Sequence, residues 1–206
     1  EGDTGKNTGG MGAYSPSRLI DKNLEKKILN KIIKPTLKGL SDINTLYKGF
    51  LYAGLMIVKN EPYLIEYNVR MGDPECQTIL PLLNSDLLKI IMSCVNEELE
   101  KVEIKWKKKK SLCVVLCSKG YPENYKKNIE IKNFEKININ KDNYLYHAGT
   151  KNEQNKIVSI GGRVLNFVSL SNNFFDARKN VFNNLKKIDW NSGFYRKDIA
   201  FKVIEK

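Results

Sequence analysis

Residues 64–75 read LIEYNVRMGDPE, and this stretch predicts a β-strand whose two faces differ in character. Alternate residues of a strand share a face, so Glu66, Asn68 and Arg70 should point to one side. The residues expected on the other side are apolar: Ile65, Tyr67 and Val69. A polar face on an otherwise apolar strand calls for either water or a ligand beside it.

The polar face carries the side chains that a metal–nucleotide site needs. Glu66 and Asn68 offer a carboxylate and an amide oxygen side by side, which are hard oxygen ligands suited to Mg²⁺. Arg70 offers a fork of donors for a phosphate or a carboxylate. The alternative is a half-exposed strand of an antiparallel sheet with water on its polar side, and both interpretations stay open at this point.

The strand is predicted to end in a turn at Gly72, because glycine permits unusual dihedral angles and proline cannot donate to a sheet. Pro74 suits the first turn of a helix, with Asp73 as its N-cap. Asp73 and Glu75 therefore add two carboxylates at the carboxyl end of the strand. Substrate amines or a metal could bind there.

Composition indicates a globular protein of 206 residues, with 41% hydrophobic and 28% charged residues. No apolar run is long enough to cross a bilayer. The net charge of +12 and the run KWKKKK at 105–110 could attract nucleic acid or anionic lipid. Only one aromatic residue interrupts that run, so we interpret it as a solvated linker and do not expect nucleic acid as the partner.

The four cysteines have no C-x-x-C spacing, and the single histidine, His147, lies in another segment, so a zinc site is not predicted. We expect reduced thiols, Cys113 and Cys117 within one buried strand, and a cytoplasmic protein. The amino terminus has neither an initiating Met nor a signal segment, so we expect the chain to begin inside a longer gene product.

Periodicity predicts an α+β fold with two domains, residues 1–104 and 105–206. The first should contain a helix over 21–40, kinked at Pro35, and an antiparallel hairpin of strands at 47–58 and 62–70. Helices over 75–83 and 85–99 should cover this sheet, the second opened by a capping segment at 84–86. The charged stretch at 100–110 marks the boundary.

The second domain is expected to be small and rich in strands, with one helix over 172–188. Strands are predicted at 111–117, 127–131, 144–148, 156–160 and 163–168. The last two should form a tight hairpin through Gly161 and Gly162.

The first seventeen residues are rich in glycine and small polar residues. Gly9, Gly10 and Gly12 would let the backbone approach a ligand closely and point amide N–H groups at an anion. A flexible terminal segment is the alternative.

Seven blocks in one order carry a family resemblance. They are NTGGMGAYSP (7–16), GFLYAGLM (49–56), IEYNVRMGDPE (65–75), GYP (120–122), HAGT (147–150), GGRV (161–164) and FYRKDI (194–199). With these blocks the chain resembles, nearly end to end, the carboxyl-terminal half of the phosphoribosylamine–glycine ligases, which are ATP-grasp enzymes of purine biosynthesis. The resemblance implies the carboxyl-terminal part of an ATP-grasp domain, an antiparallel sheet with covering helices, followed by a β-rich domain.

The resemblance also implies a reaction. ATP phosphorylates the glycine carboxylate, and the amine of 5-phosphoribosylamine attacks the glycyl phosphate, giving glycinamide ribonucleotide, ADP and phosphate. Such catalysis depends mainly on positioning and charge neutralisation.

Residue roles follow by analogy. Glu66 and Asn68 would hold Mg²⁺ or Mn²⁺ on ATP, and Arg70 would stabilise the transferred phosphoryl group with Asp73 as a second catalytic residue. The residues implied to line the glycine and phosphoribosylamine pocket are Asp3, Asn7, Thr8, Gly9, Gly10, Gly12 and Glu75.

Two departures from the family pattern matter. Many ATP-grasp members place another acid on the preceding strand, whereas residues 49–58 contain none; Met56 on that strand could pack beneath the adenine or belong to the core. The amino-terminal domain and ATP lid of the family lie outside this sequence. We therefore expect a fragment that does not turn over alone and needs the amino-terminal part of the same enzyme.

Two other functions remain as alternatives: a different ATP-grasp carboxylate–amine ligase, and a basic nucleic-acid-binding module. The sequence leaves open whether His147, Arg163 and Arg196 reach the active site or tie the second domain together.

Overall fold

The computed structural model describes residues 1–2, 4–5 and 8–204 of the chain. It has mixed helices and strands, and every strand pairing in it is antiparallel, which confirms the predicted α+β class. The chain forms two compact units. Unit 1 comprises Glu1–Ser15, Asp73–Leu82 and Lys107–Lys206, and unit 2 comprises Pro16–Gly72 and Leu83–Trp106. The predicted domain division at 104/105 stays a prediction.

Unit 1 is built on a five-stranded sheet with strand β4 (Lys110–Ser118) at its centre. One edge of β4 pairs with β9 (Arg163–Ser171), which in turn pairs with β6 (Asn143–His147). The other edge of β4 is shared by β1 (Gly12–Ser15) and β10 (Gly193–Phe194), which pair with different parts of it. Nearly all of β4 is buried because both of its faces are covered.

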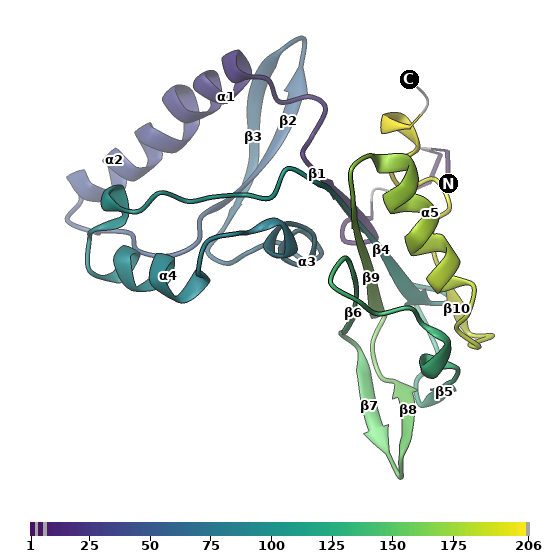
Figure 1. The fold of residues 1–206 in the computed structure, drawn as a ribbon. Helices are drawn as coiled ribbons and strands as arrows, with labels where there is room; N and C mark the ends of the chain where they lie inside the picture. Colours follow the sequence, from purple (N-terminus) through teal and green to yellow (C-terminus); the bar gives the residue numbers. More distant parts are fainter. Residues whose placement is uncertain (3, 6–7, 205–206) are drawn as a thin grey trace. The chain divides into compact units, whose positions relative to one another are not determined.

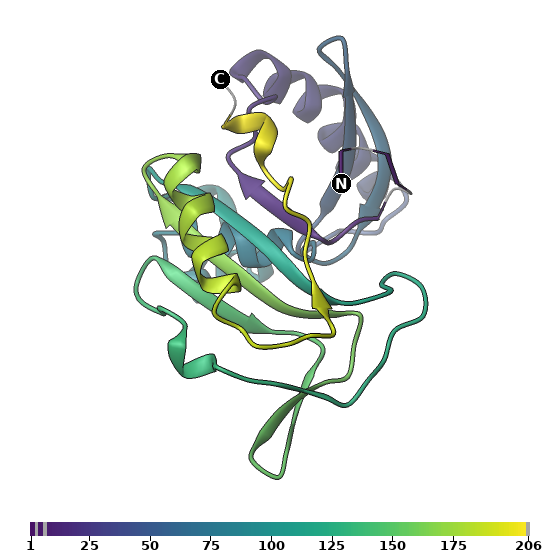
Figure 2. The same ribbon diagram turned by 90° about the vertical axis from the view of Figure 1, so that its right-hand side faces the viewer.

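Two helical segments cover the two faces of this sheet. Helix α5 (Phe174–Leu185) lies along β4 and β9 (Figures 1 and 2), and its Ala177, Val181 and Leu185 pack on Leu112 and Phe167. On the other face lie α3 (Glu75–Ile79) and the 3₁₀ turn Leu80–Leu82. A second cluster there contains Met11, Leu82, Cys113, Val115, Cys117, Val168 and Leu170.

The prediction that Gly161 and Gly162 form a tight hairpin is wrong. Strand β8 (Lys156–Ser159) instead pairs with β7 (Thr150–Glu153) and β5 (Ile129–Ile131) in a separate three-stranded sheet. The β7–β8 turn is made by Gln154 and Asn155, both with positive φ. A Cβ on Gly149 would lie 2.7 Å from the Cα of Gly161, so these glycines serve a close backbone approach. Short 3₁₀ turns occur at Phe134–Lys136 and Phe201–Val203.

Unit 2 contains the predicted hairpin, formed by β2 (Tyr52–Val58) and β3 (Glu61–Asn68). Lys59 and Asn60 make the turn with positive φ, as tight hairpin turns require. The long predicted helix is also confirmed, as α1 (Lys22–Ile28), a π-helical segment (Leu29–Ile33) and α2 (Lys34–Asp42) in succession (Figure 1). Asp21 caps its start by accepting the Leu24 N–H at 2.7 Å.

Pro35 lies in the first turn of α2, directly after the π-helical segment. Proline has no N–H to donate to the preceding turn, so the irregularity expected near Pro35 is the wider hydrogen bonding of residues 29–33.

The second half of unit 2 is helix α4 (Leu87–Val95), followed by a 3₁₀ turn at Leu99–Lys101. Asp86 is its N-cap and accepts the Lys89 N–H at 3.0 Å, which confirms the predicted capping segment. The expectation that both helices cover the β2–β3 hairpin is wrong, because α3 packs on β1, β4 and β9 of unit 1 and because Leu88 and Val95 of α4 are 67% and 53% exposed.

Residues 105–108 of the lysine run are exposed, as expected for a solvated linker, whereas Lys109 and Lys110 are half-buried. Lys107 donates through its N–H to Leu82 and through its Nζ to Pro81. Lys109 pairs with Asp142 at 2.6 Å, and Lys110 begins β4 and lies over the ring of Phe174. The charges of Lys107, Lys109 and Lys110 therefore take part in contacts within the fold.

Candidate functional site

Glu66 and Asn68 lie on one face of β3, as predicted. Asn68 Nδ2 donates to Glu66 Oε1 at 3.0 Å, so the two side chains are in contact. Opposite them, Gly54 leaves room for Glu66, since a Cβ there would lie 3.0 Å from Glu66 Cγ. The amide that donates to Glu66 presents its other atom, Oδ1, as the oxygen ligand.

Other parts of the strand prediction are wrong. β3 ends at Asn68, so Arg70 lies in a bend and donates through Nη1 to the carbonyl of Met71 at 3.0 Å. The expected buried face is open, with Ile65 66% and Val69 75% exposed. A register shift between Gly54 and Leu55 leaves Ile65 without a cross-strand partner and disturbs the alternation.

Met56 is 54% exposed on β2, so it does not belong to the core of unit 2 as described. Its suggested place beneath an adenine ring stays a prediction.

Asp73 lies in unit 1 and is held by two donors. Gln77 Nε2 donates to its Oδ1 at 3.0 Å, and Arg163 Nη2 lies 3.0 Å from its Oδ2. The predicted N-cap role is wrong, because Pro74 occupies the cap position of α3 and Asp73 precedes it. Glu75 begins α3 and is partly buried. Gln77 was not identified from the sequence, although its position four residues after Asp73 is a helical contact distance.

The glycine-rich segment runs through unit 1 beside this carboxylate. Gly10 has a φ of 80°, and its carbonyl lies 3.5 Å from Arg163 Nη1. Gly12 begins β1, where a Cβ would lie 2.8 Å from Ile199 Cγ2 and 2.9 Å from the carbonyl of Cys113. Thr8 is partly buried and Gly9 is exposed. The predicted residues Asp3 and Asn7 lie outside the described residues.

The carboxyl-terminal FYRKDI block meets the amino-terminal residues. Arg196 donates two hydrogen bonds to Asp198, whose Oδ2 also accepts the Gly2 N–H at 2.9 Å. The pKa of Asp198 is lowered, first by its hydrogen bond with Arg196, so its carboxylate stays charged. Lys197 N–H donates to Glu1 Oε1 at 2.7 Å.

His147 makes a different set of contacts. Its Nδ1 lies 3.0 Å from Thr150 Oγ1, and its ring stacks on Phe134 with centroids 5.5 Å apart. These contacts join β6 to β7 and to the 3₁₀ turn at Phe134–Lys136, and they leave open whether His147 also reaches the active site.

Cys113 and Cys117 are buried in β4, as predicted. Burial raises the pKa of both thiols, that of Cys117 to about 12. No group of three or more His, Cys, Asp or Glu side chains in residues 1–2, 4–5 and 8–204 could hold a metal ion. Nor does that part of the chain contain a helix long and apolar enough to cross a bilayer.

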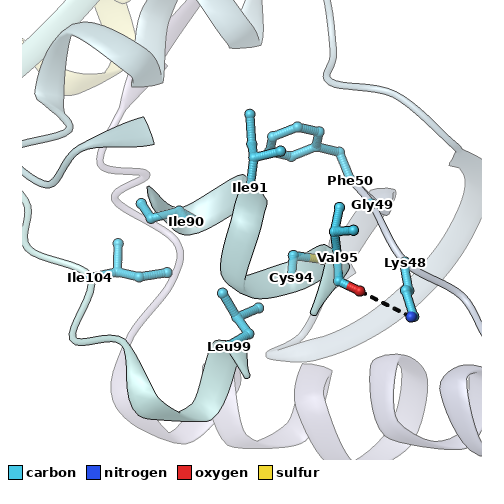
Figure 3. A pocket seen from close by; sticks show the side chains of 9 residues that line it. All are labelled: Lys48, Gly49, Phe50, Ile90, Ile91, Cys94, Val95, Leu99 and Ile104. Carbon is cyan, nitrogen blue, oxygen red and sulfur yellow. Dashed lines mark hydrogen bonds between the residues drawn. The ribbon is translucent and has the colours of Figure 1, made fainter. Parts of the chain in front are cut away.

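Unit 2 also contains an apolar pocket of about 260 Å³ that the sequence did not predict. Figure 3 shows it between α4, the turn after it and the segment before β2, with Lys48 donating to the carbonyl of Val95. Its lining residues are Lys48, Gly49, Phe50, Ile90, Ile91, Cys94, Val95, Leu99 and Ile104.

Comparison with known families gives two matches. Residues 1–76 match the phosphoribosylglycinamide synthetase ATP-grasp (A) domain, and residues 111–202 match the phosphoribosylglycinamide synthetase C domain. The first match includes Glu66, Asn68 and Arg70, and the second includes Arg163.

Curated relatives extend over the whole chain. A phosphoribosylamine–glycine ligase of Brucella melitensis is 42% identical over 206 residues, which are 100% of this chain and 48% of the relative. One of Caldanaerobacter subterraneus is 44% identical over 200 residues, covering 97% of this chain and 47% of the relative. The chain thus spans about half the length of these relatives.

Solved structures agree. The crystal structure of a phosphoribosylamine–glycine ligase from Thermotoga maritima has a TM-score of 0.84 at 32% identity, covering 97% of this chain and 49% of that one. The biotin carboxylase subunit of a pyruvate carboxylase has a TM-score of 0.60 at 11% identity over 95% of this chain and 46% of that one, a likeness of fold alone.

Proposed function

Because the chain belongs to the phosphoribosylamine–glycine ligase family, of which it represents the carboxyl-terminal half, we propose that it forms part of an enzyme that joins glycine to 5-phosphoribosylamine. In this reaction a glycine carboxylate oxygen attacks the γ-phosphorus of ATP and ADP leaves. The amine of phosphoribosylamine then attacks the acyl carbon, and phosphate leaves with formation of the amide bond.

The observation that carries the proposal is the Glu66–Asn68 pair within the segment that matches an ATP-grasp domain. The Glu66 carboxylate and the Oδ1 of the neighbouring Asn68 amide are oxygen ligands that fit a divalent cation such as Mg²⁺ or Mn²⁺, whose remaining ligands can be water and phosphate oxygens. When bound, the cation would neutralise charge on the phosphates of ATP. A cation could thus be held with no third protein ligand.

The other candidate site residues are proposed to bind and orient the substrates. Arg70 donates to the Met71 carbonyl in this structure, and its guanidinium can donate to the transferred phosphoryl group when that hydrogen bond breaks. Asp73 and Glu75 can accept hydrogen bonds from the substrates, and the backbone at Thr8, Gly9, Gly10 and Gly12 can approach them closely. The chemistry needs no enzyme nucleophile, so positioning and charge neutralisation are the contribution of the chain.

ATP turnover is proposed for a polypeptide of the relatives' full length, and the 206 residues alone are expected to be inactive. The cytoplasmic location inferred from the cysteines stays a prediction that cell fractionation can test.

Phosphate release by the full-length polypeptide that carries this chain tests the proposal. We expect release to require both glycine and phosphoribosylamine, and Glu66→Gln to reduce kcat at least tenfold while weakening Mn²⁺ binding measured by electron paramagnetic resonance. Glu61→Gln is the matched control, because Glu61 lies on the same strand but pairs with Lys27 and Lys31. Phosphate release that does not depend on glycine, or that requires another amino acid in its place, would overturn the proposal.

A further inference from the structure

Arg163 joins two segments that are far from it in the sequence. It opens β9, and its guanidinium donates to the carbonyl of Asp73 at 2.6 Å and pairs with the carboxylate of the same residue at 3.0 Å. The carbonyl of Gly10 lies 3.5 Å from the same nitrogen, Nη1. One side chain thus contacts the glycine-rich segment and the turn before α3, all within unit 1.

The guanidinium of Arg163 occupies the space that a side chain at position 10 would need. A Cβ on Gly10 would lie 2.2 Å from Arg163 Nη1, and the φ of 80° at Gly10 is one that side-chain-bearing residues rarely adopt. The contacts also use the fork of the guanidinium, with Nη1 on a carbonyl and Nη2 on the carboxylate. A lysine would offer its donors from a single nitrogen and could not reproduce this planar two-nitrogen geometry.

The carboxylate of Asp73 is fixed from two sides as a result. Arg163 holds Oδ2 and Gln77 holds Oδ1, which together set the plane of the group and leave lone pairs on both oxygens. The ion pair itself contributes little to stability, because the Arg163 and Asp73 side chains are 29% and 42% exposed. Its geometry matters more for orientation than for folding.

We propose that Arg163 is a positioning residue. It holds the Gly9–Met11 turn and the Asp73 carboxylate in one arrangement, so that the carboxylate can accept a hydrogen bond from an N–H or O–H donor of glycine or phosphoribosylamine. This inference rests on the proposed function of Asp73 and of the glycine-rich segment as parts of the substrate pocket. It assigns no contact between Arg163 and ATP.

Steady-state kinetics of Arg163→Met in the full-length polypeptide test the inference. We expect the KM for glycine or for phosphoribosylamine to rise at least tenfold, equivalent to about 1.4 kcal/mol, while the KM for ATP changes less than twofold. Arg163→Lys should show a smaller rise in the same KM, since a lysine retains the positive charge but lacks the fork of the guanidinium. Guanidinium ion added to Arg163→Ala should restore part of the activity.

The matched control is Lys109→Met, which removes another ion pair of unit 1 with similar exposure, 31% for Lys109 and 29% for Asp142. It should leave the KM values unchanged. Hydrogen exchange supplies a readout independent of activity: amides of Gly9–Met11 should exchange faster in Arg163→Met than in Lys109→Met.

The outcomes separate the two proposals. If the wild-type enzyme is active and Arg163→Met behaves like Lys109→Met in kinetics and exchange, the positioning role is overturned and the proposed function stands. If the wild-type polypeptide shows no release that depends on glycine and phosphoribosylamine, the proposed function fails. Unchanged exchange at Gly9–Met11 would still count against Arg163 as the residue that holds the turn.

Discussion

Two neighbouring glycines allow a sharp test of the geometry around Arg163. Gly10 has a φ of 80° and a Cβ there would lie 2.2 Å from Arg163 Nη1, whereas a Cβ on Gly9 would meet no atom within 4 Å. Gly10→Ala and Gly9→Ala therefore make the same chemical change in different surroundings. We expect the first to destabilise unit 1 and the second to be nearly neutral.

The magnitude follows from two native-state costs. An alanine held in a sparsely populated backbone region costs about 1–3 kcal/mol. Displacing the partly exposed Arg163 from Asp73 costs about 0.2–1 kcal/mol more. Both variants reduce the entropy of the unfolded chain equally, by about 0.4–1 kcal/mol, so this contribution cancels between them. The difference in the free energy of unfolding should therefore be about 1–4 kcal/mol.

Urea unfolding of the 206-residue chain, followed by circular dichroism, measures this difference. Thermal unfolding should show Gly10→Ala melting below Gly9→Ala by roughly 2–4 °C for each kcal/mol. Arg163→Ala should cost less in the Gly10→Ala background than in the wild type, because Gly10→Ala has already displaced Arg163 from Asp73. Equal midpoints for the two glycine variants would refute the assigned backbone conformation and the close approach of Arg163.

Three further outcomes are expected. Phe167→Ala, at a core residue only 2% exposed, should destabilise unit 1 by about 3–5 kcal/mol, whereas Phe175→Ala, at 63% exposure, should change the free energy of unfolding by less than about 0.5 kcal/mol in urea titrations. The pKa of Glu61 is lowered from 4.5 to about 2, mainly by hydrogen bonds from Lys27 and Lys31. The stabilising effect of this carboxylate on unit 2 should therefore be complete above pH 4.5 and be lost as the pH falls through 2. Carboxyl titration by NMR measures the pKa, and a value near 4.5 for Glu61 would contradict the pairing with the two lysines. Cys117, fully buried and with a pKa of about 12, should resist thiol reagents at pH 8 until the chain unfolds, as mass spectrometry of labelled peptides can check.

Local sequence signals predicted the elements that depend on local physics. The capping segment with Asp86 was recognisable because a cap acts within three residues. The β2–β3 hairpin was predictable because two strand-like runs flank a short polar turn. The pairing of Glu66 with Asn68 followed from the two-residue repeat of a strand.

The errors arose where distant segments decide the structure. Gly161 looked like a turn residue, yet it is a glycine because the backbone of Gly149 passes against it. Strand β7 carries the polar sequence TKNE, so it has no apolar alternation to reveal it. Arg163 could not be linked to Asp73 or Gly10 from sequence, since these contacts span 90 and 153 residues.

The discontinuity of unit 1 has a consequence for its synthesis on the ribosome. Strand β4 is buried along almost its whole length, but its partners β9 and β10 and its covering helix α5 all leave the ribosome after it. β1 is synthesised about a hundred residues before β4 and cannot pair until β4 has emerged. Unit 1 can therefore complete its folding only when the core residue Ala200 has emerged, and until β9 has emerged β4 exposes a long apolar strand with one edge open. Nascent chains stopped between β4 and β10 should accordingly be the species that chaperones bind and that aggregate.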